Sequence, residues 1–189
     1  TVRANADGDF PYDCLIKVVV LGTGGVTSFL YRYVDKAPLP TPPIGIGIDF
    51  KIKHLCVAGQ KLKLIVWDST LKWRRQMPSI YFRGTHIVLL LFDLTLAATF
   101  ETAKRNLEAA KESVPEGTTE FVMVLVGNKA DLASREVSFE DACALAQAEG
   151  ISYFETSCLD GRNVDECMMD AINCSLPKFG LQSETVWSR

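Results

Sequence analysis

Short runs of apolar residues alternate with amphipathic stretches along most of the chain. Residues 87–92 (IVLLLF) and 121–126 (FVMVLV) are apolar throughout and have the length of a strand. Strands that are apolar on both faces are typical of a mostly parallel sheet with helices on both sides. A β-branched run at 14–21 ends at Gly22, and residues 151–154 are expected to form the last short strand. The pattern predicts a doubly wound α/β domain, in which ligands bind beyond the carboxyl ends of the strands.

A hairpin and several helices are expected between these runs. The hairpin joins residues 48–57 to 61–67 through a short turn that contains Gly59. One helix is expected to begin after Ser138, a residue type that caps helix N-termini, and to end at Gly150. Helical spacing of apolar residues covers 99–111, 139–149 and 164–172.

Length and charge limit the classes of protein that the chain can belong to. At 189 residues, a single domain is expected, over residues 14–176, with an N-terminal extension at 1–13 and a flexible tail at 177–189. The net charge of −3 argues against a nucleic-acid partner, which normally needs a basic face. No apolar run exceeds six residues, whereas a membrane-spanning helix needs about 20. We therefore expect a chain that does not cross a membrane.

The cysteines indicate neither a zinc site nor a disulfide framework. None forms a CxxC pair, and the two histidines, His54 and His86, lie far apart in the sequence. Most of the cysteines lie in apolar stretches, which favours reduced thiols in a cytoplasmic protein. They are Cys14, Cys56, Cys143, Cys158, Cys167 and Cys174.

Two loops contain residues suited to reading guanine. Asn128, Lys129 and Asp131 form an NKxD pattern directly after an apolar run. The Asp131 carboxylate can accept the two N–H donors of the guanine edge, the Asn128 amide can reach N7, and the Lys129 stem can cover the base or ribose. After the next expected strand, residues 155–158 read ETSC.

The chain resembles the Ras superfamily, and its Rab family in particular. ETSC is similar to the family's second guanine-reading loop, which implies that the backbone N–H of Cys158, after Ser157, meets guanine O6; Leu159 replaces the usual lysine. The segments IGIDF (46–50), KLIVWD (63–68), YFRGT (81–85) and LFDLT (91–95) resemble Rab segments, in the family's order.

The resemblance covers about residues 14–176 and implies a P-loop NTPase-type small-GTPase fold. This fold has a six-stranded, mostly parallel sheet with helices on both faces. The resemblance further implies GTP or GDP and Mg²⁺ as ligands, and effectors, exchange factors and activating factors as partners. Its implied role is that of a switch in intracellular vesicle traffic, peripheral on a membrane compartment.

The phosphate-binding loop departs from the family pattern GxxxxGK[ST]. If Thr27 takes the hydroxyl position, four residues separate it from Gly22, where the pattern has six. The missing pair is Gly-Lys, and two residues remove up to about 7 Å of chain. The candidate phosphate-loop residues are Gly22, Thr23, Gly24, Gly25, Val26, Thr27 and Ser28.

The switch segments depart as well. Gly45 occupies the position of the threonine that the resemblance assigns to Mg²⁺ and the γ-phosphate. In WDSTLKW (67–73), Asp68 keeps the metal-side position, and Leu71 or Lys72 falls at the water-orienting glutamine. Neither residue orients an attacking water well, which predicts very slow hydrolysis. If the phosphate site forms, Thr27 and Asp68 would lie on its Mg²⁺ side.

Both length changes fall on signature residues. Inserting Gly-Lys after Val26 gives GTGGVGKT, and inserting Gly after Thr70 gives DSTG, each of which completes a motif. Either the shortening was selected or engineered, or the printed sequence omits residues; the sequence alone leaves these alternatives open.

The family's effector-binding surface is expected to persist. Phe50, Trp67 and Phe82 match its aromatic positions, and Trp73 lies in a basic cluster that is either a solvated helix face or part of a partner surface. The last cysteine is Cys174, so no lipid-anchor cysteine can be placed near the end of the printed sequence. Either a tail with the anchor has been removed or the protein is not anchored in this way.

Two hypotheses follow from these observations. The first is a guanine-nucleotide switch that binds weakly or in a locked state and hydrolyses poorly. The second is a nucleotide-free pseudo-GTPase that acts as a protein-interaction scaffold. An adenine-nucleotide kinase fits less well, because Asp131 selects guanine.

Overall fold

The computed structural model describes residues 11–38, 50–69, 82–114 and 121–181. Within them, six strands form one sheet in the order β2-β3-β1-β4-β5-β6. The β2–β3 pair is antiparallel, and the other neighbouring pairs are parallel. The strands are β1 (Cys14–Gly22), β2 (Phe50–Val57), β3 (Gln60–Asp68), β4 (Ile87–Asp93), β5 (Val122–Asn128) and β6 (Ser152–Glu155).

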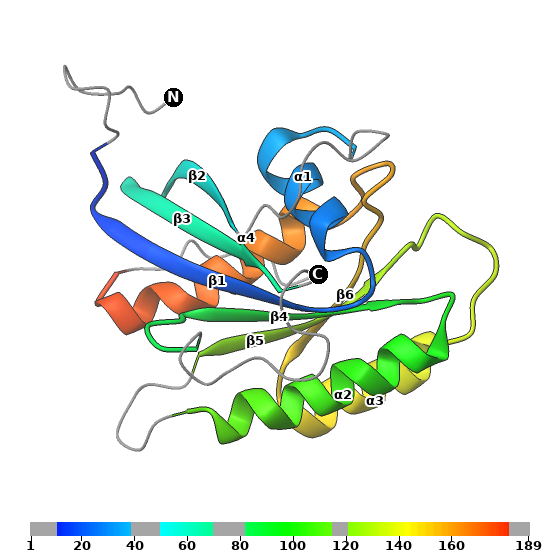
Figure 1. Ribbon diagram of the computed structural model, residues 1–189. Coiled ribbons are helices and arrows are strands. Elements are labelled where there is room, and N and C mark those ends of the chain that lie inside the picture. The colour runs from blue at the N-terminus through cyan, green and yellow to red at the C-terminus, as the bar shows by residue number, and fades with distance from the viewer. Residues whose placement is uncertain (1–10, 39–49, 70–81, 115–120, 182–189) are drawn as a thin grey trace.

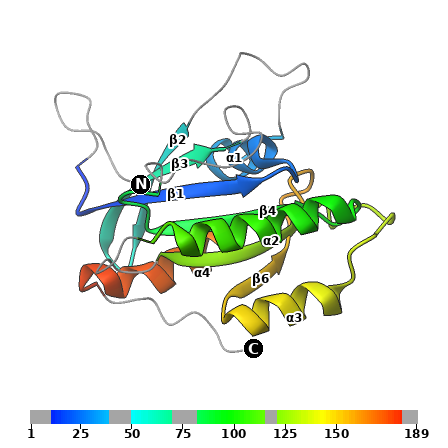
Figure 2. The same ribbon diagram turned by 60° about the horizontal axis from the view of Figure 1, so that its bottom comes forward.

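Helices cover both faces of this sheet (Figures 1 and 2). Helices α1 and α4 pack on one face through residues such as Phe29 and Met168. Helices α2 and α3 pack on the other face through residues such as Leu107 and Ala142. The described helices are α1 (Val26–Asp35), α2 (Ala97–Glu112), α3 (Phe139–Glu149), α4 (Val164–Ser175) and the 3₁₀ helix η2 (Leu176–Phe179). The predicted fold class is confirmed.

Local sequence signals explain where the elements begin and end. The Ser138 hydroxyl accepts a 3.0 Å hydrogen bond from the Asp141 N–H and caps α3, which ends at Gly150 with φ +65°. Ala58 and Gly59 both have positive φ, as the type I′ form of a two-residue hairpin turn between β2 and β3 requires. Every residue of β4 is buried, in agreement with its unbroken apolar run.

His86 connects the sheet to the segment that follows α4. Its Nδ1 accepts a 3.0 Å hydrogen bond from the Lys17 N–H, so the neutral ring carries its proton on Nε2. Its ring lies 4.8 Å from that of Phe179 in η2, the first part of the segment expected to be a flexible tail. Burial, with Lys17 and Lys178 nearby, holds the pKa of His86 below its usual range.

The six cysteines all lie in the described residues and carry free thiols. In the same part of the chain, no helix has the length and apolar character needed to cross a membrane.

Candidate functional site

The loops after β1, β5 and β6 meet at the carboxyl edge of the parallel strands, on the right in Figure 1. These loops contain the candidate nucleotide-binding residues that were predicted from the sequence. Hydrogen bonds between them, described below, make the three loops one structural unit.

The glycine-rich loop between β1 and α1 lies tightly against β4. A β-carbon built on Gly24 would lie 2.3 Å from the carbonyl carbon of Phe92, so only glycine fits at this point. Gly25 caps the N-terminus of α1 with φ +96°, which also favours glycine. Thr23 is exposed, whereas Val26 is buried in the core. The loop between β1 and α1 therefore consists of only three residues, Thr23 to Gly25.

Thr27 and Asp68 lie together, although they are 41 positions apart in the sequence. The Thr27 hydroxyl donates a 2.6 Å hydrogen bond to Asp68 Oδ2. One carboxylate and one hydroxyl are oxygen donors of the kind that Mg²⁺ uses when waters and substrate phosphates complete its shell. The two residues thus fit a Mg²⁺ site that is shared with a nucleotide. Ser28, the next residue of α1, is half-buried.

Asn128 links the glycine-rich loop to the loop after β6. It is only 2% exposed, and its Nδ2 donates a 2.8 Å hydrogen bond to the Gly24 carbonyl. Its Oδ1 accepts from the Cys158 N–H at 3.3 Å and from the Thr156 hydroxyl at 3.4 Å. The amide nitrogen carries two hydrogens, and among the described residues only the Gly24 carbonyl accepts from it, which leaves one donor for a base.

The two other residues of the NKxD pattern differ in their surroundings. Lys129, in the left-handed conformation at φ +67°, forms a 2.5 Å ion pair with the buried Asp93. Burial alone would raise the pKa of Asp93, but hydrogen bonds from Lys129 and Thr95 outweigh it and hold that pKa below its usual value. Asp131 is half-buried.

The loop after β6 is held by its own side chains. The buried Ser157 hydroxyl accepts hydrogen bonds from the Leu159 and Asp160 N–H groups at 3.2 and 3.3 Å. Burial raises the pKa of the Cys158 thiol to about 12, so the thiol stays protonated and donates to Asn128 Oδ1 at 3.2 Å. The Leu159 side chain is 68% exposed beside this loop.

The predicted aromatic surface is only partly present. Phe50 is 44% exposed, and its ring centroid lies 5.1 Å from that of Trp67. Phe82 is only 3% exposed and stacks on Phe121 in the core, with ring centroids 5.7 Å apart. The expectation that Phe82 contributes to the surface is therefore wrong in this conformation. Gly45, Leu71, Lys72 and the basic cluster around Trp73 lie outside the described residues.

Sequence reasoning missed two residues that hold these loops. Asp93 pairs with Lys129, and Arg32 of α1 donates to carbonyls of the loop after β6. The LFDLT segment contained Asp93, but its partner follows β5 and is not visible in any local pattern. Arg32 lies in α1, a helix that the spacing of apolar residues in the sequence did not predict.

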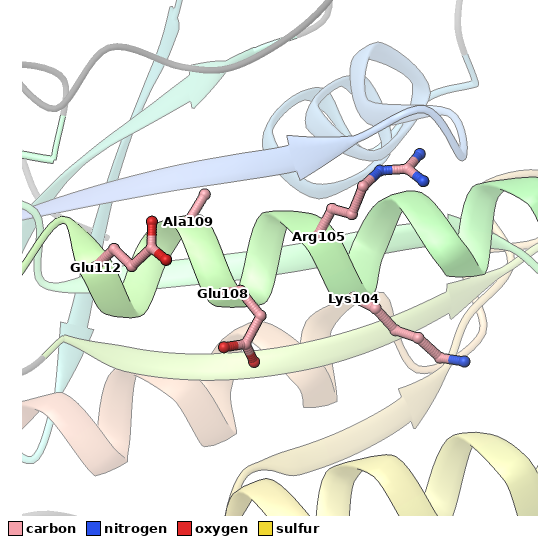
Figure 3. Close-up of a pocket in the computed structure, with 5 residues that line it drawn as sticks. All are labelled: Lys104, Arg105, Glu108, Ala109 and Glu112. Atoms are coloured by element: carbon pink, nitrogen blue, oxygen red, sulfur yellow. The ribbon is translucent and has the colours of Figure 1, made fainter.

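A shallow depression of about 340 Å³ lies elsewhere, on α2 (Figure 3). Two of its charged side chains are engaged within the helix: Lys104 pairs with Glu101, and Arg105 donates to the Thr102 hydroxyl. Its described lining contains no residue from the three loops.

The sheet order and the three linked loops define a small-GTPase fold, and comparison with known proteins agrees. A family model described as "Ras family" matches residues 17–176. The chain is 36% identical over 173 residues to "Ras-related protein Rab-13" of Canis lupus familiaris, covering 89% of this chain and 84% of that protein. It is 37% identical to "Ras-related protein Rab-10" of Caenorhabditis elegans, with 89% and 85% covered. It is 34% identical to "Ras-related protein SEC4" of Saccharomyces cerevisiae, with 88% and 77% covered.

The chain belongs to the Rab family of Ras-related small GTPases. Members of this family bind GTP or GDP with Mg²⁺ and interact with effectors, exchange factors and activating proteins.

Proposed function

We propose that this Rab-family protein binds guanine nucleotide, GTP or GDP, weakly or in a locked state, and hydrolyses GTP poorly. It acts as a switch that recruits effectors in intracellular vesicle traffic, peripherally on a membrane compartment. The observation that carries the proposal is the position of Asn128, which joins the glycine-rich loop to the loop after β6 through Gly24 and Cys158. This proximity supports the proposal, because the Asn128 amide and the Cys158 N–H are groups suited to a guanine edge.

The residues expected to contact the nucleotide phosphates favour weak nucleotide binding and slow GTP hydrolysis. The glycine-rich loop contains no lysine, and the backbone of Gly24 lies directly against β4. A loop this short has fewer N–H groups to surround a phosphate than a full P-loop has. With Leu71 or Lys72 at the water-orienting position, the attacking water has no good hydrogen-bond partner. Thr27 and Asp68 would hold Mg²⁺.

The second candidate is a nucleotide-free scaffold that acts through protein partners. It is favoured by the exposure of Phe50 next to Trp67, which leaves an aromatic surface open to a protein partner. In this alternative, effectors bind the same aromatic surface without any dependence on nucleotide.

Inserting Gly-Lys after Val26 distinguishes these candidates. The inserted lysine supplies a charged hydrogen bond to phosphate, so we expect GDP affinity by calorimetric titration to rise at least tenfold over the unmodified chain. Insertion of Gly-Gln restores the length without the charge and should give a smaller rise. If neither insertion raises GDP affinity, the short loop is not what limits binding. If neither the unmodified chain nor the insertions bind GDP, the protein is a scaffold.

A further inference from the structure

Arg32 of α1 reaches across to the loop after β6. Its Nε donates a 2.7 Å hydrogen bond to the Cys158 carbonyl, and its Nη2 donates to the Leu159 carbonyl. The loop also lies against the aliphatic part of the side chain, since a β-carbon built on Gly161 would be 3.5 Å from Arg32 Cδ. Among the described residues, no carboxylate forms an ion pair with Arg32. In the part of the chain that the structure describes, the partners of the guanidinium are therefore the two loop carbonyls.

Arg32 and Ser157 hold the same two peptide groups from opposite ends. The peptide between Cys158 and Leu159 has its carbonyl bonded to Arg32 and its N–H bonded to Ser157 Oγ. The next peptide, between Leu159 and Asp160, is held in the same way. Because each peptide group is planar, fixing both ends fixes its orientation. The backbone directly after the Cys158 N–H is thereby locked.

The Cys158 N–H is the group whose direction matters to a base. Its hydrogen bond to Asn128 Oδ1 is 3.3 Å long, beyond the usual N–H···O range of 2.7–3.2 Å. A long hydrogen bond of this kind can be shared with a second acceptor on the same side. Guanine O6 is such an acceptor, whereas adenine presents an amino group at that position.

We propose that Arg32 is a positioning residue for guanine specificity: it holds the loop at Cys158 and Leu159 so that the Cys158 N–H faces O6 of the base. The inference rests on the proposed nucleotide binding and deepens it. Arg32 does not contact the nucleotide itself; it acts through two carbonyl groups. Lysine has a single nitrogen and cannot reproduce the forked contact of arginine.

The test compares GDP with 6-thio-GDP, in which sulfur replaces O6 and is a weaker acceptor. The unmodified chain should prefer GDP. Arg32→Ala should reduce the ratio of the two affinities roughly fivefold to tenfold, which is the factor that one neutral hydrogen bond contributes. Most of this change should come from weaker binding of GDP. Arg32→Lys should retain part of the preference. Arg105→Ala, an exposed arginine on α2, is the matched control and should leave both affinities unchanged.

The possible outcomes separate the two claims. If the unmodified chain binds neither ligand, the proposed nucleotide binding fails, and this inference fails with it. If the unmodified chain binds GDP but Arg32→Ala weakens both ligands equally or not at all, the positioning role is refuted while nucleotide binding stands. If Arg32→Ala does not fold, Arg32→Lys decides, because an unchanged GDP preference in that variant also refutes the role.

Discussion

Replacing Asn128 with alanine should destabilise the whole protein, apart from any effect on nucleotide. The substitution removes the 2.8 Å hydrogen bond to the Gly24 carbonyl and leaves the Cys158 N–H without its acceptor. Each buried polar group left unsatisfied costs about 1–3 kcal/mol. Because the Cys158 bond is long, we expect a total loss of roughly 2–4 kcal/mol. In a domain of this size, that corresponds to a fall in Tm of roughly 4–16 °C.

Urea unfolding without nucleotide measures this loss directly. Asn106→Ala is the matched control, because Asn106 lies within α2, where alanine is the better helix former; its unfolding free energy should stay equal or rise slightly. Asn128→Asp keeps the size of the side chain but turns the donor that faces Gly24 into an acceptor, so it should destabilise the fold as well. Surface substitutions typically change the free energy of unfolding by less than about 0.5 kcal/mol. If the free energy of unfolding of Asn128→Ala differs from that of the unmodified chain by no more than this, Asn128 does not hold the loops together.

Two further changes test the packing around the site and the sheet. Gly24→Ala should lower the Tm more than Gly59→Ala does. A β-carbon at Gly24 would lie 2.3 Å from the β4 backbone, whereas a β-carbon at Gly59 has no neighbour within 4 Å and only the positive φ is unfavourable. Equal falls in Tm would contradict the close approach of Gly24 to β4. Because the pKa of His86 is lowered in the folded state, its contribution to stability is present above about pH 6.5 and is lost as the pH falls through the folded-state pKa. The unmodified chain should therefore lose more unfolding free energy between pH 7.5 and 5.5 than His86→Gln, and parallel losses in the two proteins would show that His86 does not titrate in this way.

The strands and most helices follow from the sequence because each has a local cause. The unbroken apolar run of β4 requires cover on both faces, and helices are found on both. Ser138 and Gly150 define α3 through its cap and its left-handed end. These signals depend on neighbouring residues alone, so they can be read without knowledge of the fold.

The site was only partly predictable, since its links join distant segments. The NKxD pattern identified Asn128 as a base ligand, but its bond to the Gly24 carbonyl spans 104 residues. The burial of Phe82 depends on Phe121, which lies beyond α2 in the sequence. Similarly, Phe179, within the segment expected to be a tail, packs against the ring of His86, 93 positions earlier in the chain. Contacts of this kind have no periodicity and appear only in the folded chain.

A native mass spectrum of the purified protein tests the central claim most directly, because it weighs the chain and any bound nucleotide together. The account predicts the mass of the chain plus a guanine nucleotide, with GTP retained because hydrolysis is poor. Bound GDP would contradict slow turnover if GDP was absent throughout purification. The mass of the chain alone, after incubation with GTP and Mg²⁺, would contradict nucleotide binding and leave the scaffold as the function of this fold.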